Sequence, residues 1–449
     1  MEMKTKMTST QTKVKLQREL GLFSAVCLII NSTLGSGIFV SAGSALKNTG
    51  SVGMCLVIWV ACGLLSLLGA LSFAELGTMV HKSGGQFSFY QFAFADLHKF
   101  WGPLPSFIYS WVNIMYTRPA GAAIIILTFA EYFIRPVSLW SSMTPETEST
   151  MKILVGILAL CTITFINYTS TKGFIKIQNV FTVCKITACL LVIVGGQYQL
   201  YMGNNKNITT GFEGTTLTIS TLPMAFYSGL WAFDGWASSI MVIEEIKKPQ
   251  INILMSIVLA VPLMTAVYVL MNISYLTVLS VPEMISAPAV AVEFGTRALG
   301  DFSPIIPLGV AISTFGCALC LQFQATRICF AASREGQMLE VFSYVSTKKL
   351  TLAPAVVLQV PIVIPIFVLF MSVVLFLTPI IAEPKPQFLI ALAFILSAFF
   401  IYVPFVYQKK RFSAVDHFTK SIQTLMGVMP QEKDNDPDIE MCGEQQCRT

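Results

Sequence analysis

Residues 31–40 read NSTLGSGIFV and lie inside the first stretch of this chain that is long and apolar enough to cross a membrane. Irregular backbone is tolerated at membrane depth only where it is buried in protein or lines a cavity. Gly35 and Gly37 have no side chain, and Ser36 between them has a small one, so the helix can unwind there. Taken alone, the pattern fits a broken helix with free amide groups as well as it fits close helix packing through small residues.

A second interruption favours the broken helix. Residues 226–236 read FYSGLWAFDGW and place Gly229, Gly235 and the ionisable Asp234 in the middle of another apolar stretch. The two breaks lie at matching depth in the first and sixth spans, and such corresponding interruptions indicate a transporter built from inverted repeats. The half-helix after the first break would point the positive end of its dipole at a carboxylate. The sequence therefore predicts a binding site between the two breaks.

The composition is that of an integral membrane protein. The 449 residues are 54% hydrophobic and only 12% charged, whereas a soluble domain is about 25% charged. A spanning helix needs about 20 apolar residues. About ten spans are predicted, at residues 21–43, 52–76, 103–133, 153–168, 176–198, 219–243, 253–280, 303–332, 356–381 and 387–407. The expected fold class is all-α: one polytopic transmembrane helix bundle over residues 21–407, between a cytosolic tail at 1–20 and a cytosolic, partly disordered tail at 408–449.

Basic residues predict the sidedness of the bundle, because cytosolic loops carry an excess of Lys and Arg. They occur before the first span, after the last span and in alternate loops: Lys4, Lys6, Lys13, Lys15, Arg18, Lys172, Lys176, Lys247, Lys248, Lys348, Lys349, Lys409, Lys410 and Arg411. Both termini are therefore expected in the cytosol. These loops account for the net charge of +5, and no nucleic-acid partner is predicted.

The eleven cysteines point to free thiols. Nine lie in or beside apolar spans and two lie in the C-terminal tail, and the chain has only three His. No metal site and no cofactor are predicted from this set. The external loop between the fifth and sixth spans contains the sequon Asn207-Ile208-Thr209. Asn207 is therefore predicted as an N-glycosylation acceptor.

Three charged residues lie within predicted spans: Asp234 in the sixth, Lys185 in the fifth and Arg118 in the third. A charge inside the membrane is costly, so by default it marks a functional site and needs a partner. Asp234 would face a ligand cation or an intramembrane Arg or Lys, although a purely structural pairing with a helix end also satisfies it. Lys185 needs a partner inside the bundle, unless its long side chain reaches the membrane interface.

Several motifs, in order along the chain, now resemble a known family. They are NSTLGSGIFVS, GALSFAELGTMVHKSGG, FYSGLWAFDGW followed by EEIKKP, and SREGQML after the eighth span. Together they resemble the light subunits of heteromeric amino-acid transporters, the L-type family within the amino acid/polyamine/organocation superfamily. The resemblance runs from about residue 20 to residue 339 and is nearest to the cystine/dibasic and aromatic-preferring members. It implies a LeuT-like core of two inverted five-helix repeats, sodium-independent exchange of L-amino acids and a multi-pass protein of the plasma membrane.

The resemblance also implies roles for single residues. The turn that would bind the substrate α-carboxylate through its backbone amides consists of Thr33, Leu34, Gly35, Ser36 and Gly37. Backbone carbonyls of the two breaks would take the α-amino group. Trp231 would be the gate over the substrate, with Phe233 and Asp234 beside it. The gating and coupling residues would be Lys185, Arg118 and Ser313, and Lys185 would stand where related transporters hold sodium.

Asp234 leaves the substrate range open. Many members of the family that carry large neutral amino acids have Gly at this place, whereas the cystine and dibasic member has the same A-x-D-G-W arrangement. A carboxylate there could accept a cationic side chain, which favours dibasic as well as neutral substrates. Alternatively, Asp234 pairs with Arg118 and leaves a neutral pocket that tolerates aromatic side chains.

Two departures from the family pattern qualify the prediction. The loop between the third and fourth spans, RPVSLWSSMTPETEST, lacks the cysteine that joins the family's light subunits to a single-span glycoprotein heavy subunit. A heavy subunit is therefore expected to bind without a disulfide, or not at all. The family has twelve helices, but here the sequence that resembles the start of the ninth runs at Gln359-Val360 into sequence that resembles the eleventh and twelfth. The expected bundle is short by two helices.

The leading hypothesis is an exchanger that works by alternating access around the broken helices. The alternative is a truncated, transport-deficient variant that acts by binding a heavy subunit or a full-length relative. An ion channel is disfavoured because rings of charge and a repeated filter motif are missing. An enzyme is disfavoured because the chain has no HExxH, GxSxG or P-loop pattern.

Overall fold

The computed structural model describes residues 16–140, 144–216, 218, 221–287, 289–346 and 351–358, with short pieces at 397, 402–408, 418–419, 421–423, 426 and 428–429. Its first span is broken, as predicted. Helix α1 (Leu22–Thr33) and helix α2 (Gly37–Thr49) meet at an angle of 51°. The sixth span is broken as well, into α9 (Thr221–Phe233) and the short α10 (Ser238–Met241).

The other predicted spans within the described residues are long helices. They are α3 (Val52–Met79), α5 (Leu104–Val112) continued by a π-helical turn (Asn113–Thr117) and α6 (Arg118–Trp140), α7 (Pro145–Thr169), α8 (Thr171–Tyr201), α11 (Pro249–Val278) and α14 (Ile305–Arg334). Helix α7 begins eight residues before its predicted start, because Thr144 caps it by accepting a hydrogen bond from the Thr147 N–H and Pro145 fits the first turn. The predicted span at 356–381 falls almost wholly outside the described residues, as does the junction at Gln359-Val360, and the span at 387–407 is described only at 397 and 402–407.

Short elements connect the spans. They are α4 (Gln86–Phe94), η2 (Ile243–Glu245), α12 (Val281–Ser286), α13 (Val290–Ala298), η3 (Gly300–Phe302), η4 (Glu340–Ser343) and α15 (Ala353–Leu358). The π-helical segment η5 (Tyr402–Tyr407) lies at the end of the predicted span 387–407. The two-residue strands β1 (Val345–Ser346) and β2 (Val428–Met429) pair in antiparallel fashion, so a piece of the C-terminal region lies against the loop that follows α14. The predicted all-α fold class is confirmed, because the described part of the chain contains only this one sheet, of two short strands, and is otherwise helical.

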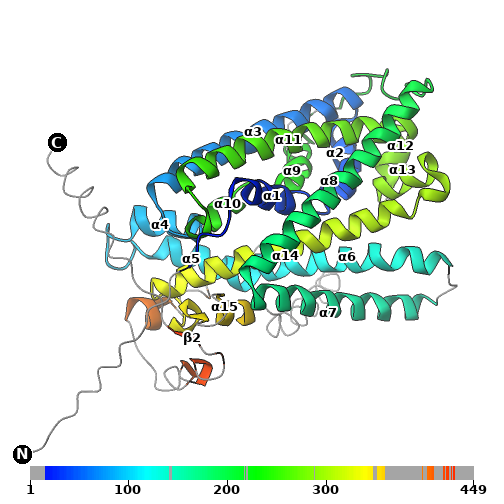
Figure 1. Ribbon diagram of the computed structural model, residues 1–449. Helices are drawn as coiled ribbons and strands as arrows, with labels where there is room; N and C mark the ends of the chain where they lie inside the picture. The colour runs from blue at the N-terminus through cyan, green and yellow to red at the C-terminus, as the bar shows by residue number, and fades with distance from the viewer. Residues whose placement is uncertain are drawn as a thin grey trace, which may run out of the picture.

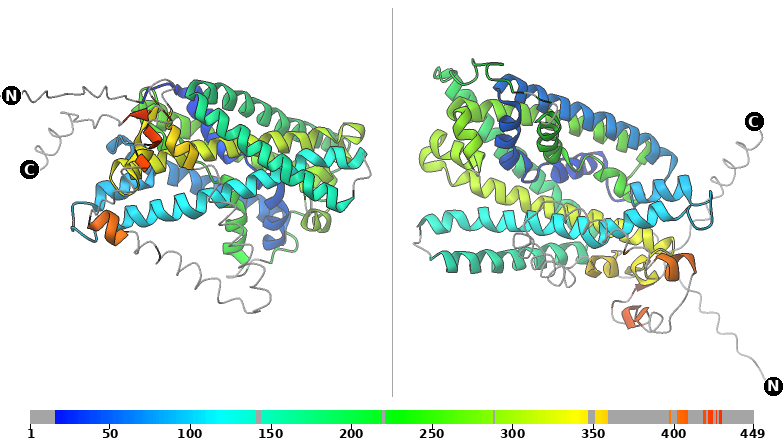
Figure 2. Two further views of the ribbon diagram at one scale, coloured as in Figure 1. Left: turned by 90° about the horizontal axis from the view of Figure 1, so that it is seen from below. Right: turned by 180° about the vertical axis from the view of Figure 1, so that it is seen from behind.

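Helix α1 lies in the middle of the bundle, whereas α2 and α9 lie together at one edge of it in the left view of Figure 2 (Figures 1 and 2). Helix α9 packs on α2 and α3, α10 packs on α1, and α1 is also flanked by α8, α11 and α14. In Figure 1, α6 and α7 run along the far side of α14 from α1. In its most apolar stretch α14 is 67% buried within the protein and α7 only 17%. Helix α14 is thus the central helix, and α7 leaves most of its surface to lipid.

Candidate functional site

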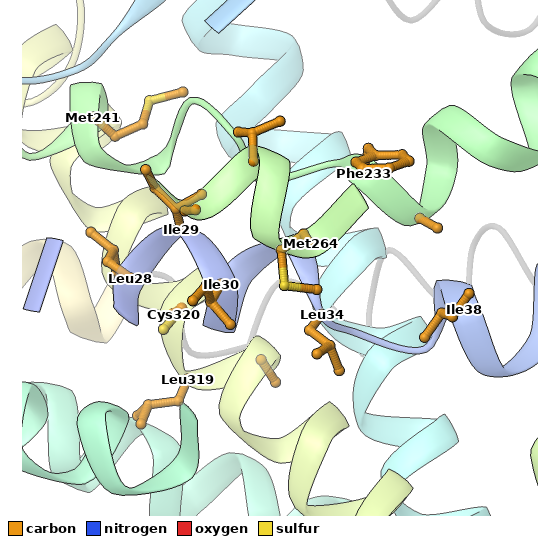
Figure 3. Close-up of a cluster of buried hydrophobic side chains, with 14 of the residues drawn as sticks. Leu28, Ile29, Ile30, Leu34, Ile38, Phe233, Met241, Met264, Leu319 and Cys320 are labelled. Atoms are coloured by element: carbon orange, nitrogen blue, oxygen red, sulfur yellow. The ribbon is translucent and has the colours of Figure 1, made fainter. Parts of the chain in front are cut away.

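The two breaks cross in direct contact. A Cβ atom added to Gly37 would lie 2.6 Å from the Cα atom of Ala232, and one added to Gly235 would lie 2.7 Å from the backbone carbon of Ser32. Gly235 also has a φ of +116°, a backbone angle that residues other than glycine rarely adopt. Both interpretations of the glycines therefore hold, since each glycine allows a break and also lets the other broken span approach. Figure 3 shows the crossing, with Leu34 and Ile38 on either side of the first break and Phe233 at the end of α9.

Lys185 satisfies the carbonyl groups at the end of α1. Its side chain is completely buried, and its Nζ atom donates to the carbonyl oxygens of Asn31 and Leu34, each at 2.8 Å. The side chain therefore stays in the bundle and does not reach the membrane interface. These carbonyls would otherwise be unpaired at a helix C-terminus, so one ammonium group holds the end of α1 against α8.

Helix α14 adds two more donors to the same helix end. The hydroxyl group of Ser313 donates to the carbonyl oxygens of Leu34 at 2.8 Å and Gly35 at 3.4 Å. The Cys317 thiol donates to the carbonyl oxygen of Ser32 at 3.3 Å. Ser313, which was predicted as a coupling residue, and Lys185 thus share the Leu34 carbonyl oxygen.

Tyr268 on α11 connects the two breaks and was missed by sequence reasoning. Its hydroxyl group lies 3.1 Å from the carbonyl oxygen of Thr33, the last residue of α1, and 2.9 Å from that of Ala232 near the end of α9. The ring is fully buried against Trp59 and Phe233, with centroids 5.6 and 5.0 Å away. One signal could have found it, because a tyrosine deep in an apolar span needs a partner for its hydroxyl group.

Complementary backbone groups stay free at the crossing. Within the described residues, the N–H groups of Ser36, Gly37 and Ile38 donate to no backbone acceptor. On the other break, the carbonyl oxygens of Phe233 and Asp234 accept no hydrogen bond from the described chain. The start of α2 carries the positive end of a helix dipole and the end of α9 the negative end. The crossing therefore offers donors for an anion beside acceptors for a cation.

The predicted side chains around the crossing differ in exposure. Trp231 is 50% exposed and Asp234 is exposed too, so both remain open to a ligand. Phe233, in contrast, is 1% exposed and belongs to the aromatic cluster with Trp59 and Tyr268. The structure places Phe233 where it supports the end of α9 and leaves Trp231 as the accessible aromatic side chain.

Arg118 and Asp234 do not form an ion pair among the described residues. The charges of both act on Tyr109 of α5, which donates a hydrogen bond of 2.8 Å to Oε1 of Gln86. Arg118 borders a small cavity between α6, α7 and α14, and its buried Nε atom has no acceptor in the described structure. Asp234 is therefore free to meet a ligand cation in this state.

The predicted glycosylation residue lies against a helix end. The side-chain amide of Asn207 donates to the carbonyl oxygens of Leu276 at 3.2 Å and Leu279 at 3.0 Å, at the end of α11. Attachment of a glycan would replace one of the two hydrogens on this nitrogen atom, so a glycosylated Asn207 could keep at most one of the two hydrogen bonds.

A helix bundle with two crossed breaks in its first and sixth spans has the LeuT-like fold. A solved relative of that fold is the structure described as MhsT in complex with L-phenylalanine, which matches with a TM-score of 0.52 and 14% identity over 91% of this chain and 87% of that one. The sequence identifies the family, since residues 20–428 match the amino acid permease family. This chain belongs to the amino acid permease family and is a non-enzymatic, multi-pass membrane protein.

Curated relatives agree with this assignment. The b(0,+)-type amino acid transporter 1 of Mus musculus is 39% identical over 95% of this chain and 96% of its own length. The cystine/glutamate transporter of Homo sapiens is 39% identical over 78% of this chain and 68% of its own. The large neutral amino acids transporter small subunit 2 of Mus musculus is 36% identical over 76% of this chain and 63% of its own length. The predicted resemblance to light subunits of heteromeric amino-acid transporters is confirmed.

One alignment contains more positions than this chain has residues. The match to the Mus musculus b(0,+)-type transporter extends over 481 positions, whereas this chain has 449 residues. The relative therefore has residues with no counterpart here. This agrees with the expected loss of helices.

Proposed function

We propose that this chain is a sodium-independent antiporter of neutral and dibasic L-amino acids in the plasma membrane, with both termini in the cytosol. The observation that carries the proposal is the crossing itself, where free N–H groups of Ser36, Gly37 and Ile38 lie beside free carbonyl groups of the second break. An α-amino acid is a carboxylate beside an ammonium group, and the crossing offers a complementary partner to each.

Lys185 supports sodium independence. Its ammonium group already donates to the carbonyl oxygens of Asn31 and Leu34, and Ser313 shares the second of these. A sodium ion bound there would have to displace a buried cation of the protein. We infer that the fixed charge of Lys185 replaces a coupling ion.

The side chain of the substrate would meet Asp234 and Trp231. The carboxylate of Asp234 has no cationic partner in the described structure, so an arginine or lysine substrate could form a charge-assisted hydrogen bond with it. Trp231 is half exposed above the break and can cover a neutral or aromatic side chain instead. This arrangement favours a range that includes both neutral and dibasic amino acids.

We further propose a heavy subunit that binds without a disulfide. The relative from Mus musculus is described as a small subunit, and the loop between α6 and α7 of this chain contains no cysteine. The residues of the b(0,+)-type transporter that have no counterpart in this chain favour a second candidate function, a transport-deficient chain that acts by association.

Counter-flow in proteoliposomes tests the proposal. Vesicles with the purified chain are loaded with leucine, and labelled arginine, cystine, leucine and tyrosine are offered outside, in sodium and in choline. Label should enter loaded vesicles only, at equal rates in both salts. Folded protein without uptake of any of the four would reject the exchanger and favour the second candidate.

A further inference from the structure

Two consecutive glutamates after the second break pair with two arginines of α14. Glu245 and Arg327 form a two-point contact, with N···O distances of 2.7 and 3.0 Å, and their side chains are 1% and 3% exposed. Glu244 and Arg334 form a second contact at 2.9 and 3.2 Å, with side chains 17% and 16% exposed. The inner pair, Glu245 and Arg327, is thus excluded from solvent, whereas the outer pair, Glu244 and Arg334, remains partly accessible to water.

The inner pair is fully enclosed by aromatic and polar contacts. The Arg327 guanidinium lies 3.3 Å from the centre of the Phe323 ring, which stacks on Phe174 of α8 at 3.7 Å. Its remaining donors reach the hydroxyl oxygen of Thr326 at 2.7 Å and the carbonyl oxygen of Phe323 at 3.1 Å. The contact therefore holds η2, α8 and α14 together.

The same place also anchors the start of α1. The backbone N–H of Leu20 donates to the carbonyl oxygen of Glu245 at 2.9 Å, and the N–H of Lys247 donates to the carbonyl oxygen of Leu20 at 2.8 Å. Both broken spans thus meet α14 through one small region, on the side of the membrane assigned above to the cytosol. The substrate site can open to that side only if this region separates.

A buried ion pair is a poor device for stability alone, because the cost of desolvating both charges offsets much of their attraction. Its advantage is reversibility. Once the region opens, water hydrates both charges, whereas apolar side chains in the same places would be exposed at a cost. An ion pair therefore keeps the closed and open states close in free energy.

We propose that Glu245 and Arg327 are positioning residues that close the cytosolic side of the substrate site and open it by hydration of their charges. The proposal rests on the proposed function in that it assigns a step of alternating access. It predicts that an apolar pair in the same places favours the closed state.

The test compares the wild type with Glu245→Met plus Arg327→Met, and uses the more exposed ion pair Lys82 and Glu335, as Lys82→Met plus Glu335→Met, for the control. Counter-flow gives the exchange rate, and hydrogen–deuterium exchange of the Leu20 and Lys247 amides reports opening directly. The inner apolar pair should slow exchange of amino acids by about tenfold or more and slow deuterium uptake at both amides. The control should change either rate by less than about twofold.

Wild-type rates in both measurements for the inner apolar pair would overturn the proposal. If that variant does not fold, Arg327→Lys keeps the charge but loses the two-point contact, and deuterium uptake at Leu20 and Lys247 should rise. Unchanged uptake in Arg327→Lys would equally overturn it. Failure of the wild type to exchange amino acids would reject the proposed function, while the deuterium comparison would still decide whether the pair holds the closed state.

Discussion

Tyr268 is the residue whose hydroxyl group contacts both breaks, at Thr33 and at Ala232. Tyr268→Phe keeps the ring in its aromatic cluster and removes only the hydroxyl group. A buried hydrogen bond contributes about 1 kcal/mol, so the half-saturation concentration for leucine should rise by roughly five- to tenfold. Counter-flow at graded leucine concentrations measures it.

The chain offers a matched control for this variant. Tyr275 lies on the same helix two turns later and is also fully buried, but its hydroxyl group has no hydrogen-bond partner in the described structure. Tyr275→Phe should therefore leave the half-saturation concentration unchanged. Equal effects of the two substitutions would show that Tyr268 acts through general packing of α11.

The proposed role of Asp234 predicts different effects on dibasic and neutral substrates. Asp234→Asn removes the charge and keeps the shape, so labelled arginine uptake should fall by about tenfold because a charge-assisted hydrogen bond is lost. Leucine uptake should stay within about twofold. Uptake of the two amino acids in the same vesicle preparation measures the ratio, and an equal loss of both would assign Asp234 a structural role.

At the scale of elements, the short helix α12 between α11 and α14 begins with a capping box. The hydroxyl and the backbone N–H of Ser280 donate to the Glu283 carboxylate, and with Arg297 nearby they lower its pKa from 4.5 to about 2. When a carboxyl group has a lower pKa in the folded chain than in the unfolded chain, it stabilises the fold at every pH above the unfolded-state pKa. This stabilisation is lost as the pH falls through the folded-state pKa. The cap is therefore intact at neutral pH.

Glu283→Gln tests this cap. The variant should unfold at a lower temperature than the wild type at pH 6 to 7, and the difference should shrink as the pH is lowered from about 5 toward 2, because the wild-type carboxylate becomes protonated. Thermal unfolding followed by circular dichroism measures both proteins. A difference that stays constant over this range would show that the charge of Glu283 does not carry the effect.

Some elements could be predicted from the sequence and others could not. The breaks at Gly35–Gly37 and Asp234–Gly235 have local signals, because glycine and an intramembrane charge stand out in an apolar helix. A tyrosine or an arginine in an apolar span signals that it needs a partner, but the sequence does not identify the partners of Tyr268 and Arg327, which lie 235 and 82 residues away in the chain. Phe233 shows the same limit, since its place in a motif says nothing about which way its ring faces.

At the scale of the whole molecule, the absence of a cysteine between α6 and α7 predicts how a heavy subunit associates. A complex with a single-span glycoprotein should survive mild detergent and should separate in SDS without a reducing agent. Non-reducing electrophoresis of the purified complex measures this. A covalent complex that reducing agent dissolves would show that one of the eleven cysteines forms the link instead.

The deep burial of α14 has a consequence for biosynthesis. Helices α1, α6 and α8 all pack on α14, yet each of them leaves the ribosome before residue 305 is made. Until α14 is inserted, their inward faces, including Lys185 and the end of α1, must contact lipid, water or other parts of the protein. Helix association after insertion is a separate stage of membrane protein folding. The first half of this chain therefore reaches its final packing only once the second half has been translated.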